Sequence, residues 1–481
     1  MTSPSRGADA RDDRWPAFAV CLGAGFMALL DVSIVNVALP SIESSLAASP
    51  SDLQWIVAGY TLAFGLVLVP AGRLGDAIGR RRMFLIGLAG FVLASAACGL
   101  VTSASALAVV RLVQGVAAGI LNPQVVGLIQ QLFQGPERGR AFGMFGAVVG
   151  ISTATGPLIG GVLLAAFGEE QGWRAVFLVN VPIGLVLLPL AWKLLPRTAR
   201  VPGPLRLDVI GLATLGVGTI CLMLPFVVAS EGGGLSSAPW WLVGVAVVVL
   251  ATFVWWERRF ERRGGRPVVT AALARTRSFT FGAGIGGAYF AGFTSIFLIV
   301  TLYLQNGLGL SPLQAGLVQT PFALGGAVGA IAGGRLVTRY GRWLVVAGIV
   351  TVIVGLVATD VAATVVDPEL LPWVVAACLS VAGVGNGFVI SPNQTLALAD
   401  VPVAQGGTAG ATIQTVQRIG TSIGVAVTTA VFFTTLAATG PSVEGYGEAL
   451  AVGLRVTIGL VTLALLVALV DALRRQRVTP R

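Results

Sequence analysis

The chain has 481 residues, of which 55% are hydrophobic and only 11% are charged, and its mean hydropathy is +0.87. A water-soluble protein with this balance would not stay in solution, so the composition predicts a membrane protein. The net charge of +10 would suit a nucleic-acid-binding protein, but the basic residues follow membrane topology instead. There is no histidine, and all four cysteines lie inside apolar runs without metal-ligand spacing, so no metal site is expected.

Fourteen apolar runs are long enough to cross the hydrocarbon core, which takes about 20 helical residues. They are residues 15–38, 53–71, 83–101, 105–125, 140–166, 175–194, 207–229, 238–256, 279–303, 312–334, 343–363, 371–391, 405–436 and 449–470. The first run follows a polar tail and has no small-residue cleavage site, which indicates an uncleaved span and not a signal peptide. The sequence therefore predicts an all-α polytopic membrane protein.

The distribution of basic residues supports this number of spans. If the N-terminus is cytoplasmic, strict alternation places 27 of the 31 basic residues in inner loops and tails. The other four, Arg111, Arg174, Arg418 and Arg455, lie within spans or at their outer ends, and the outer loops are acidic. We therefore expect a multi-pass protein of the cell membrane with both termini in the cytoplasm.

A charged turn after the second span, residues 72–82, has the sequence Gly-Arg-Leu-Gly-Asp-Ala-Ile-Gly-Arg-Arg-Arg. A degraded copy, residues 334–342, follows the tenth span 262 residues later, which indicates an internal duplication with two extra spans between the halves. We expect two pseudo-symmetric six-helix bundles and two additional central helices. The expected segments are a tail (1–14), an N-terminal transport domain (15–195), a linker with the two extra helices and a basic inner loop (196–278), a C-terminal transport domain (279–471) and a tail (472–481). The inner loop is expected to be either an amphipathic helix on the inner leaflet or a solvated linker.

The 72–82 turn contains an aspartate and glycines that are not needed to anchor the loop on the cytoplasmic side. Asp76 can cap a following helix or pair with an arginine across the domain interface, and the glycines of the turn allow close backbone approach. This predicts a conformational gate, and the alternative is simple anchoring by the arginines. The gate residues would be Gly72, Asp76, Gly79, Arg80 and Arg81. Thr338 replaces the aspartate in the second copy, so the two halves cannot gate identically.

Asp31 is a carboxylate deep in the first span, where it costs roughly 2.5–3.5 kcal/mol on insertion scales and is functional by default. At about 1.5 Å per residue, Asp31 lies about 24 Å along its span and Arg111 about 10 Å below the outer surface, so both fall in the outer half of the membrane. We expect them to interact in at least one state and to take part in proton coupling, with Asn36 nearby. The alternative is a permanent structural ion pair.

Five local patterns occur in order along the chain. They are Leu-Asp-Val-Ser-Ile-Val-Asn-Val-Ala-Leu-Pro (30–40), the 72–82 turn, Leu107–Arg111 with Gln114-Gly115, the glycines at 146, 150, 156, 160 and 161 with Pro157, and Trp173-Arg174 with Asn-Val-Pro-Ile-Gly (180–184). Over nearly its whole length the chain resembles the major facilitator superfamily, and within it the fourteen-span drug:proton antiporter family. The resemblance implies that Gly150, Gly156, Pro157, Gly160 and Gly161 bend the fifth span and seal the domain interface against proton leak. Ordinary helix packing is the alternative explanation of the glycines.

A site for lipophilic compounds should be mostly apolar and aromatic with a few polar anchors. The candidates are Asn36, Tyr60, Phe64, Tyr289, Phe293, Gln319, Phe322, Asn386, Asn393 and Arg418. No acidic residue in the ninth, tenth or thirteenth span matches Arg418, which makes a doubly cationic substrate less suitable.

The sequence contains no phosphate-binding loop and no nucleophile–base pair, so neither ATP-driven transport nor an enzyme is expected. We expect a monomeric proton-coupled antiporter in the lipid bilayer that exports amphipathic drugs or metabolites by alternating access, with the proton as coupling ion and no cofactor. Its partners are protons and small amphipathic substrates, and no nucleic acid. The alternatives are a dedicated exporter of one endogenous compound, such as a lipid or antibiotic, and a proton-coupled uptake carrier of the same superfamily.

Overall fold

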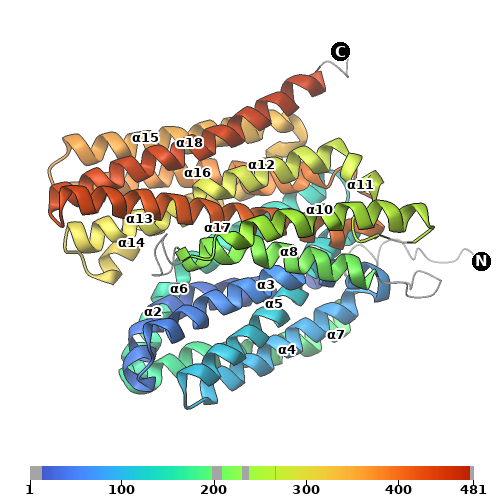
Figure 1. Cartoon of the computed structure of the whole chain (residues 1–481), viewed down its shortest axis with the longest axis horizontal. Coiled ribbons are helices and arrows are strands. Elements are labelled where there is room, and N and C mark those ends of the chain that lie inside the picture. Colours follow the sequence, from blue (N-terminus) through green and yellow to red (C-terminus); the bar gives the residue numbers. More distant parts are fainter. Residues whose placement is uncertain (1–13, 198–207, 230–237, 266, 477–481) are drawn as a thin grey trace, which may run out of the picture. The chain divides into compact units, whose positions relative to one another are not determined.

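A computed structural model of the chain describes residues 14–197, 208–229, 238–265 and 267–476 (Figure 1). The expected N-terminal tail up to residue 13, three parts of the expected linker and residues 477–481 of the C-terminal tail lie outside the described residues. All elements in the described ranges are helical, and no strand occurs among them.

Fourteen helical segments of the described chain are long and apolar enough to cross a membrane, and each overlaps one of the fourteen predicted runs. The helices are α2 (Arg14–Leu46), α3 (Pro50–Ile78), α4 (Arg80–Leu100), α5 (Ala104–Leu132), α6 (Gly135–Leu178), α7 (Asn180–Leu194), α8 (Val209–Val228), α10 (Trp241–Arg262), α11 (Ala271–Arg275), α12 (Arg277–Phe293), α13 (Ser295–Leu302), α14 (Pro312–Tyr340), α15 (Arg342–Val365), α16 (Leu371–Ala397), α17 (Gly406–Thr439) and α18 (Val443–Gln476). A π-helix, η2 (Tyr303–Gly307), completes the span formed by α12 and α13, and a 3₁₀ turn, η3 (Val403–Gln405), precedes α17. The predicted all-α, fourteen-span class is confirmed.

Helices α3 and α14 begin and end with the same capping residues, as expected for an internal duplication. Each begins after a serine whose side chain and the residue three positions on form a capping box, with Ser49 and Asp52 in α3 and Ser311 and Gln314 in α14. Each ends at a glycine with positive φ, which is 111° at Gly79 and 53° at Gly341. Equivalent residues are again 262 positions apart, so the repeat extends over the whole second and tenth spans.

The chain divides into two compact units by contacts. The first comprises residues up to 134, 159–207 and 402–411, and its core includes Trp173 and Phe177 packed with residues of α2. The second comprises 135–158, 208–401 and 412–481, with a core built around α12, α14, α15, α16 and α18. Helices α6 and α17 each contribute to both units. The domain boundaries expected from the sequence stay predictions.

The two additional helices, α8 and α10, make their most extensive contacts with each other and lie side by side (Figure 1). Asp208 caps α8 by accepting a hydrogen bond from Gly211 N at 2.8 Å, and it also accepts one from Trp256 Nε1 at 2.8 Å. Glu257, on the same helix as Trp256, accepts hydrogen bonds from the backbone of Val268 (3.2 Å) and Val269 (2.9 Å). The loop after α10 is therefore folded back onto its helix, and its helical part is the single short helix α11.

Candidate functional site

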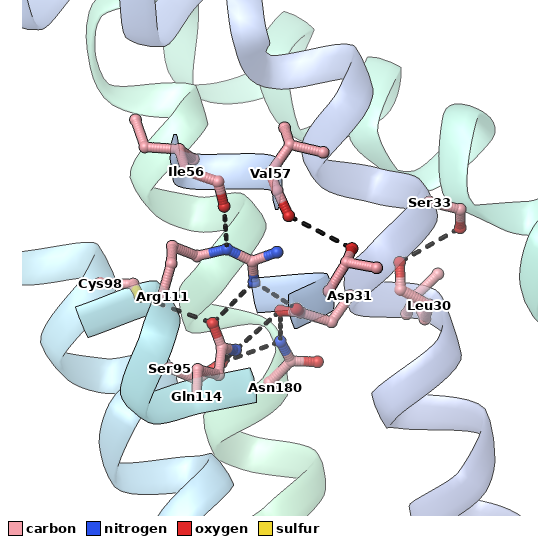
Figure 2. A network of polar contacts seen from close by, with 11 residues as sticks. Leu30, Asp31, Ser33, Ile56, Val57, Ser95, Cys98, Arg111, Gln114 and Asn180 are labelled. Atoms are coloured by element: carbon pink, nitrogen blue, oxygen red, sulfur yellow. Dashed lines mark hydrogen bonds and ion pairs between the residues drawn. The ribbon is translucent and has the colours of Figure 1, made fainter. Parts of the chain in front are cut away.

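An ion pair between Asp31 of α2 and Arg111 of α5 lies inside the first unit (Figure 2). Asp31 Oδ2 and Arg111 Nη1 are 2.6 Å apart, and the two residues are 0% and 2% exposed. The sequence placed both residues in the outer half of the membrane, and the structure brings them into direct contact. The predicted interaction is therefore present in the structure.

The other oxygen of Asp31 is held by two amide groups. Oδ1 accepts hydrogen bonds from Gln114 Nε2 and Asn180 Nδ2, both at 2.9 Å. The same two amides donate to Ser95 Oγ of α4, at 2.8 and 3.0 Å, so helices α2, α4, α5 and α7 converge on one carboxylate (Figure 2). Every side chain in this network is buried. Each hydrogen bond that the structure shows at this carboxylate is therefore donated by a neighbouring side chain.

Sequence reasoning assigned no role to Ser95, Gln114 or Asn180. Gln114 and Asn180 belong to recognised sequence patterns, and Gln114 follows Arg111 by three residues, which places the two on one helix face. Ser95 had no such signal beyond being polar in an apolar span. Asn36, in contrast, was expected near Asp31, but it is exposed and none of the described hydrogen bonds joins it to the network.

Arg111 is held by more than its counter-ion. Its Nε donates to the carbonyl of Ile56 at 3.1 Å, and its guanidinium lies 4.2 Å from the ring centroid of Tyr60. Tyr60 in turn stacks on Phe64 at 6.3 Å between centroids. A cation over an aromatic ring in a desolvated site gains about 2 kcal/mol. Arg111 also donates to Gln114 Oε1 at 2.8 Å, so several of its interactions do not depend on the charge of Asp31.

The 72–82 turn forms a second buried polar cluster in the first unit, centred on Asp76. Its Oδ1 accepts from Arg80 Nη2 (2.8 Å) and from Gly407 N (3.1 Å), and its Oδ2 accepts from the backbone and hydroxyl of Thr408, both at 2.8 Å. The helix that Asp76 caps is therefore α17, which follows it at a large distance in sequence. Its ion pair is with Arg80 in the same turn, and not with an arginine of the other half. The sequence did not reveal the α17 partner, because α17 carries no charged residue at this position.

The other predicted gate residues each have a distinct contact or backbone conformation. Gly72 approaches α17 so closely that an added Cβ would lie 2.6 Å from Gly407 O. Gly79 adopts φ 111° at the helix boundary. Arg80 also donates to Gly127 O at 2.5 Å, while Arg81 donates to the carbonyl of Trp192 and lies over its ring.

The second copy of the turn is built differently. Thr338, at the position equivalent to Asp76, is exposed. Arg342, at the position equivalent to Arg80, is 3% exposed and pairs with Asp471 of α18 at 2.7 Å. It also donates to Asn393 Oδ1 at 2.6 Å. Asn393 is therefore part of this arginine cluster, and Asp471, which the sequence analysis did not single out, supplies its negative charge.

The glycines of the fifth span face two different helices. In the second unit, an added Cβ at Gly150 would lie 2.9 Å from Ala323 O of α14. In the first unit, a Cβ at Gly160 would lie 3.2 Å from Ile34 of α2, whereas one at Gly161 would meet nothing within 4 Å. Gly156 is buried, and α6 continues through Pro157 until non-helical angles occur at Gly168 (φ 76°). Close packing thus explains Gly150 and Gly160, and it leaves Gly161 unexplained.

Several expected substrate residues of the second unit form one aromatic cluster. Tyr289 donates to Asn386 Oδ1 at 2.8 Å and stacks on Phe293 at 5.5 Å, and Phe293 lies 5.7 Å from Phe322. Tyr289 and Phe322 are 0% and 2% exposed, so in this conformation they pack in the core. Gln319 Nε2 donates a hydrogen bond to Thr301 Oγ1 at 2.8 Å.

Arg418 is half-buried in α17.

A family profile described as Major Facilitator Superfamily matches residues 21–425. The chain is 38% identical to a probable actinorhodin transporter from Streptomyces coelicolor, over 87% of this chain and 72% of the relative, and 35% identical to the puromycin resistance protein pur8 of Streptomyces alboniger, over 97% and 93%. Among solved structures, the human organic anion transporter MFSD10 (TETRAN) superimposes with a TM-score of 0.67 at 15% identity, covering 95% of this chain and 99% of that one. At that identity the likeness to the human protein supports the fold alone.

Proposed function

The chain belongs to the major facilitator superfamily, and on that premise we propose that it is a proton-coupled antiporter that exports amphipathic drugs or metabolites across the cell membrane. Its relatives include proteins named as antibiotic transporters and antibiotic resistance proteins, which supports export of small molecules. We propose that both termini are cytoplasmic, because the basic residues gather in the loops on that side.

The buried carboxylate of Asp31 is the observation that supports proton coupling. A buried ion pair is weak support for stability, because desolvation of both charges offsets their attraction. A carboxylate inside a membrane span is instead typical of ion and proton pathways. A proton that binds the Asp31 carboxylate would take the place of its ion pair with Arg111. Amide groups donate to the other carboxylate oxygen.

The chemistry of that replacement follows from the donors around Asp31. A proton on the carboxyl group removes its charge and turns one acceptor oxygen into a donor, so one of the groups that donate to it must leave. Arg111 is released from its counter-ion but keeps the Ile56 carbonyl and the Tyr60 ring. Such a change in bonding gives the protonated and ionised states different preferred conformations, which a coupling ion requires.

The Asp76 cluster is proposed to be the conformational gate. Asp76 and Arg80 hold the first turn of α17, and a helix N-terminus favours a negative charge at this position by about 0.3–1 kcal/mol. Opening the cytoplasmic side would require these bonds to break together. We propose that the glycines of the fifth span provide the close contacts across which helices slide during this step.

Dedicated export of one compound is the second candidate, and the names of the relatives favour it. One relative is a probable actinorhodin transporter and another a tetracenomycin C resistance and export protein. The Tyr289, Phe293 and Phe322 cluster is compatible with a flat aromatic substrate if it becomes accessible in another state. A panel of amphipathic dyes and aromatic antibiotics distinguishes broad from dedicated export.

The proposal is tested in inverted membrane vesicles with an acidic lumen. We expect dye to accumulate against its gradient in vesicles with the wild-type protein, because luminal protons drive the exchange. Asp31→Asn keeps the side-chain shape but cannot take up a proton. It should reduce gradient-driven accumulation to the level of vesicles without the protein, while exchange of labelled for unlabelled dye at equal pH persists.

The matched control is Asp360→Asn, which removes a carboxylate whose partner Arg455 is exposed. This variant should accumulate dye like the wild type. Full coupling in Asp31→Asn would contradict the role of Asp31. No gradient-driven movement of any compound in the panel by the wild type would contradict export itself.

A further inference from the structure

A basic hollow lies in the first unit beside the 72–82 turn, and neither Asp31 nor Asp76 lines it. It has a volume of about 610 Å³ and is lined by residues from the start of α2, the start of α4, the end of α5 and the end of α7. A second hollow of about 330 Å³ shares Arg81, Trp192 and Arg197 with it. The larger volume falls in the range of about 300–1,000 Å³ that is typical of small-molecule sites.

Cationic side chains from separate segments converge on this hollow. Arg14 comes from α2, Arg81 from α4, and Lys193 and Arg197 from the end of α7 and the residue stretch after it. Among the described residues that line the two hollows, none is acidic. The cluster therefore presents several positive charges around one space.

These cations differ from the buried arginines elsewhere in the chain. Arg80, Arg111 and Arg342 each pair with a carboxylate within 4 Å. No ion pair within the described part of the chain involves Arg81, Lys193 or Arg197.

Arg81 is nevertheless held in place, because it donates to the carbonyl of Trp192 and its guanidinium lies 5.2 Å from the centre of the Trp192 ring. A fixed cation with no described carboxylate partner is suited to an anionic ligand.

The surroundings of the hollow favour a lipid over a free anion. Trp192, which is 63% exposed, has the amphipathic ring that is typical of the membrane interface. Helices α4 and α7 pack side by side next to the hollow (Figure 1). Along them, exposed apolar side chains such as Ile86, Val186 and Leu190 provide a surface for acyl chains.

From these observations we propose that the hollow lined by Arg81, Trp192, Lys193 and Arg197 binds the phosphate of an anionic glycerophospholipid, with the acyl chains lying along α4 and α7. Basic pockets between spanning helices on the cytoplasmic side bind such headgroups. Since the hollow lies next to the 72–82 turn, a bound lipid contacts Arg81 directly and changes the electrostatic environment of that turn.

The experiment measures lipid retention by native mass spectrometry of the purified full chain. Protein is mixed in detergent with phosphatidylglycerol or with phosphatidylcholine of the same acyl chains. We expect wild-type protein to retain phosphatidylglycerol at lower lipid concentration than phosphatidylcholine. The double variant Lys193→Gln/Arg197→Gln should need about 30-fold more phosphatidylglycerol for the same retention, since each basic residue near a membrane surface contributes about 1 kcal/mol.

Two control variants distinguish a specific lipid site from a general effect of positive charge. Arg258→Gln/Arg259→Gln removes two exposed basic residues of α10 and should retain phosphatidylglycerol like the wild type. Lys193→Arg/Arg197→Lys keeps both charges and should also retain it. Equal weakening in the α10 variant, or no preference for phosphatidylglycerol in the wild type, would overturn the proposal.

A further arm distinguishes the source of the phosphate. Inorganic phosphate and glycerol 3-phosphate, added at the concentration of the lipid, should leave phosphatidylglycerol bound, because neither can use the apolar surface of α4 and α7. Displacement of the lipid by either soluble anion would assign the hollow to a free phosphate and would overturn the lipid assignment. These outcomes do not depend on transport, so they are independent of the proposed function.

Discussion

The turns at 72–82 and 334–342 are copies in sequence, yet their buried arginines have different partners. Arg80 pairs with Asp76 of its own turn, at 2.8 Å, and shares it with the first turn of α17. Arg342 pairs at 2.7 Å with Asp471 of α18, which is far away in sequence. Both arginines are 3% exposed, so each needs a counter-charge. The comparison shows that duplication preserved the buried cation while its anion moved to another helix.

The first glycine of each turn shows the same divergence. A Cβ at Gly72 would lie 2.6 Å from Gly407 O of α17, and one at Gly334 would lie 2.4 Å from Gly139 O of α6. Both positions exclude side chains because a neighbouring backbone is in contact. The repeat therefore specifies that a helix approaches closely, but it does not specify which one.

Replacing Asp76 by the residue of the second copy, Asp76→Thr, should have the largest effect. Arg80 would remain buried without a counter-charge, which costs about 3–5 kcal/mol, and loss of the carboxylate cap on α17 would add about 0.5–2 kcal/mol. We expect a lower melting temperature in detergent and no gradient-driven transport in vesicles. Asp76→Glu, which keeps the charge, should lose less. Wild-type stability and transport in Asp76→Thr would show that the two turns are equivalent after all.

Asp471→Asn should have the next largest effect, because it removes the anion of the second copy without removing a helix cap. Leaving Arg342 uncompensated should cost about 3–5 kcal/mol and lower the melting temperature. The double variant Asp471→Asn/Arg342→Gln should recover part of this loss, since no buried charge is then left unpaired. If the double variant is no more stable than the single one, the arginine and aspartate are not energetically coupled.

Thr338→Asp should have the smallest effect, although it restores the aspartate of the first turn. Position 338 is exposed, so stability should change by less than about 0.5 kcal/mol. Transport in vesicles should match the wild type. A marked gain or loss in either measurement would mean that the second turn has a functional partner in another conformation.

The span count, the topology of the repeat and the Asp31–Arg111 contact could be predicted from the sequence because each rests on a strong physical constraint. Crossing the membrane fixes helix length, and a charged residue within a span requires a partner at the same depth. The family resemblance drawn from local patterns is confirmed by the matching profile and relatives. Proton coupling, the gate and the substrate residues stay predictions.

The α17 groups that bind Asp76 and the Asp471 partner of Arg342 could not be predicted, because they come from helices far away in sequence. The acceptors and donors involved include backbone groups, such as Gly407 N, that leave no trace in the side-chain sequence. Ser95 and Asn180 were missed for a related reason, since a neutral polar residue in a span has many possible roles. Hydrogen-bond partners are set by helix packing, which local patterns do not determine.

The hairpin of α8 and α10 has a consequence for how this architecture arose. Asp208 caps the first helix and binds Trp256 of the second, while Glu257 closes the loop that leads back to the chain. The residues that cap the hairpin and hold its following loop therefore belong to the hairpin itself. Its two helices also pack most extensively against each other. Such a cassette can be gained or lost in evolution as one piece, and a twelve-helix ancestor would not have needed to rebuild its cores to accept it.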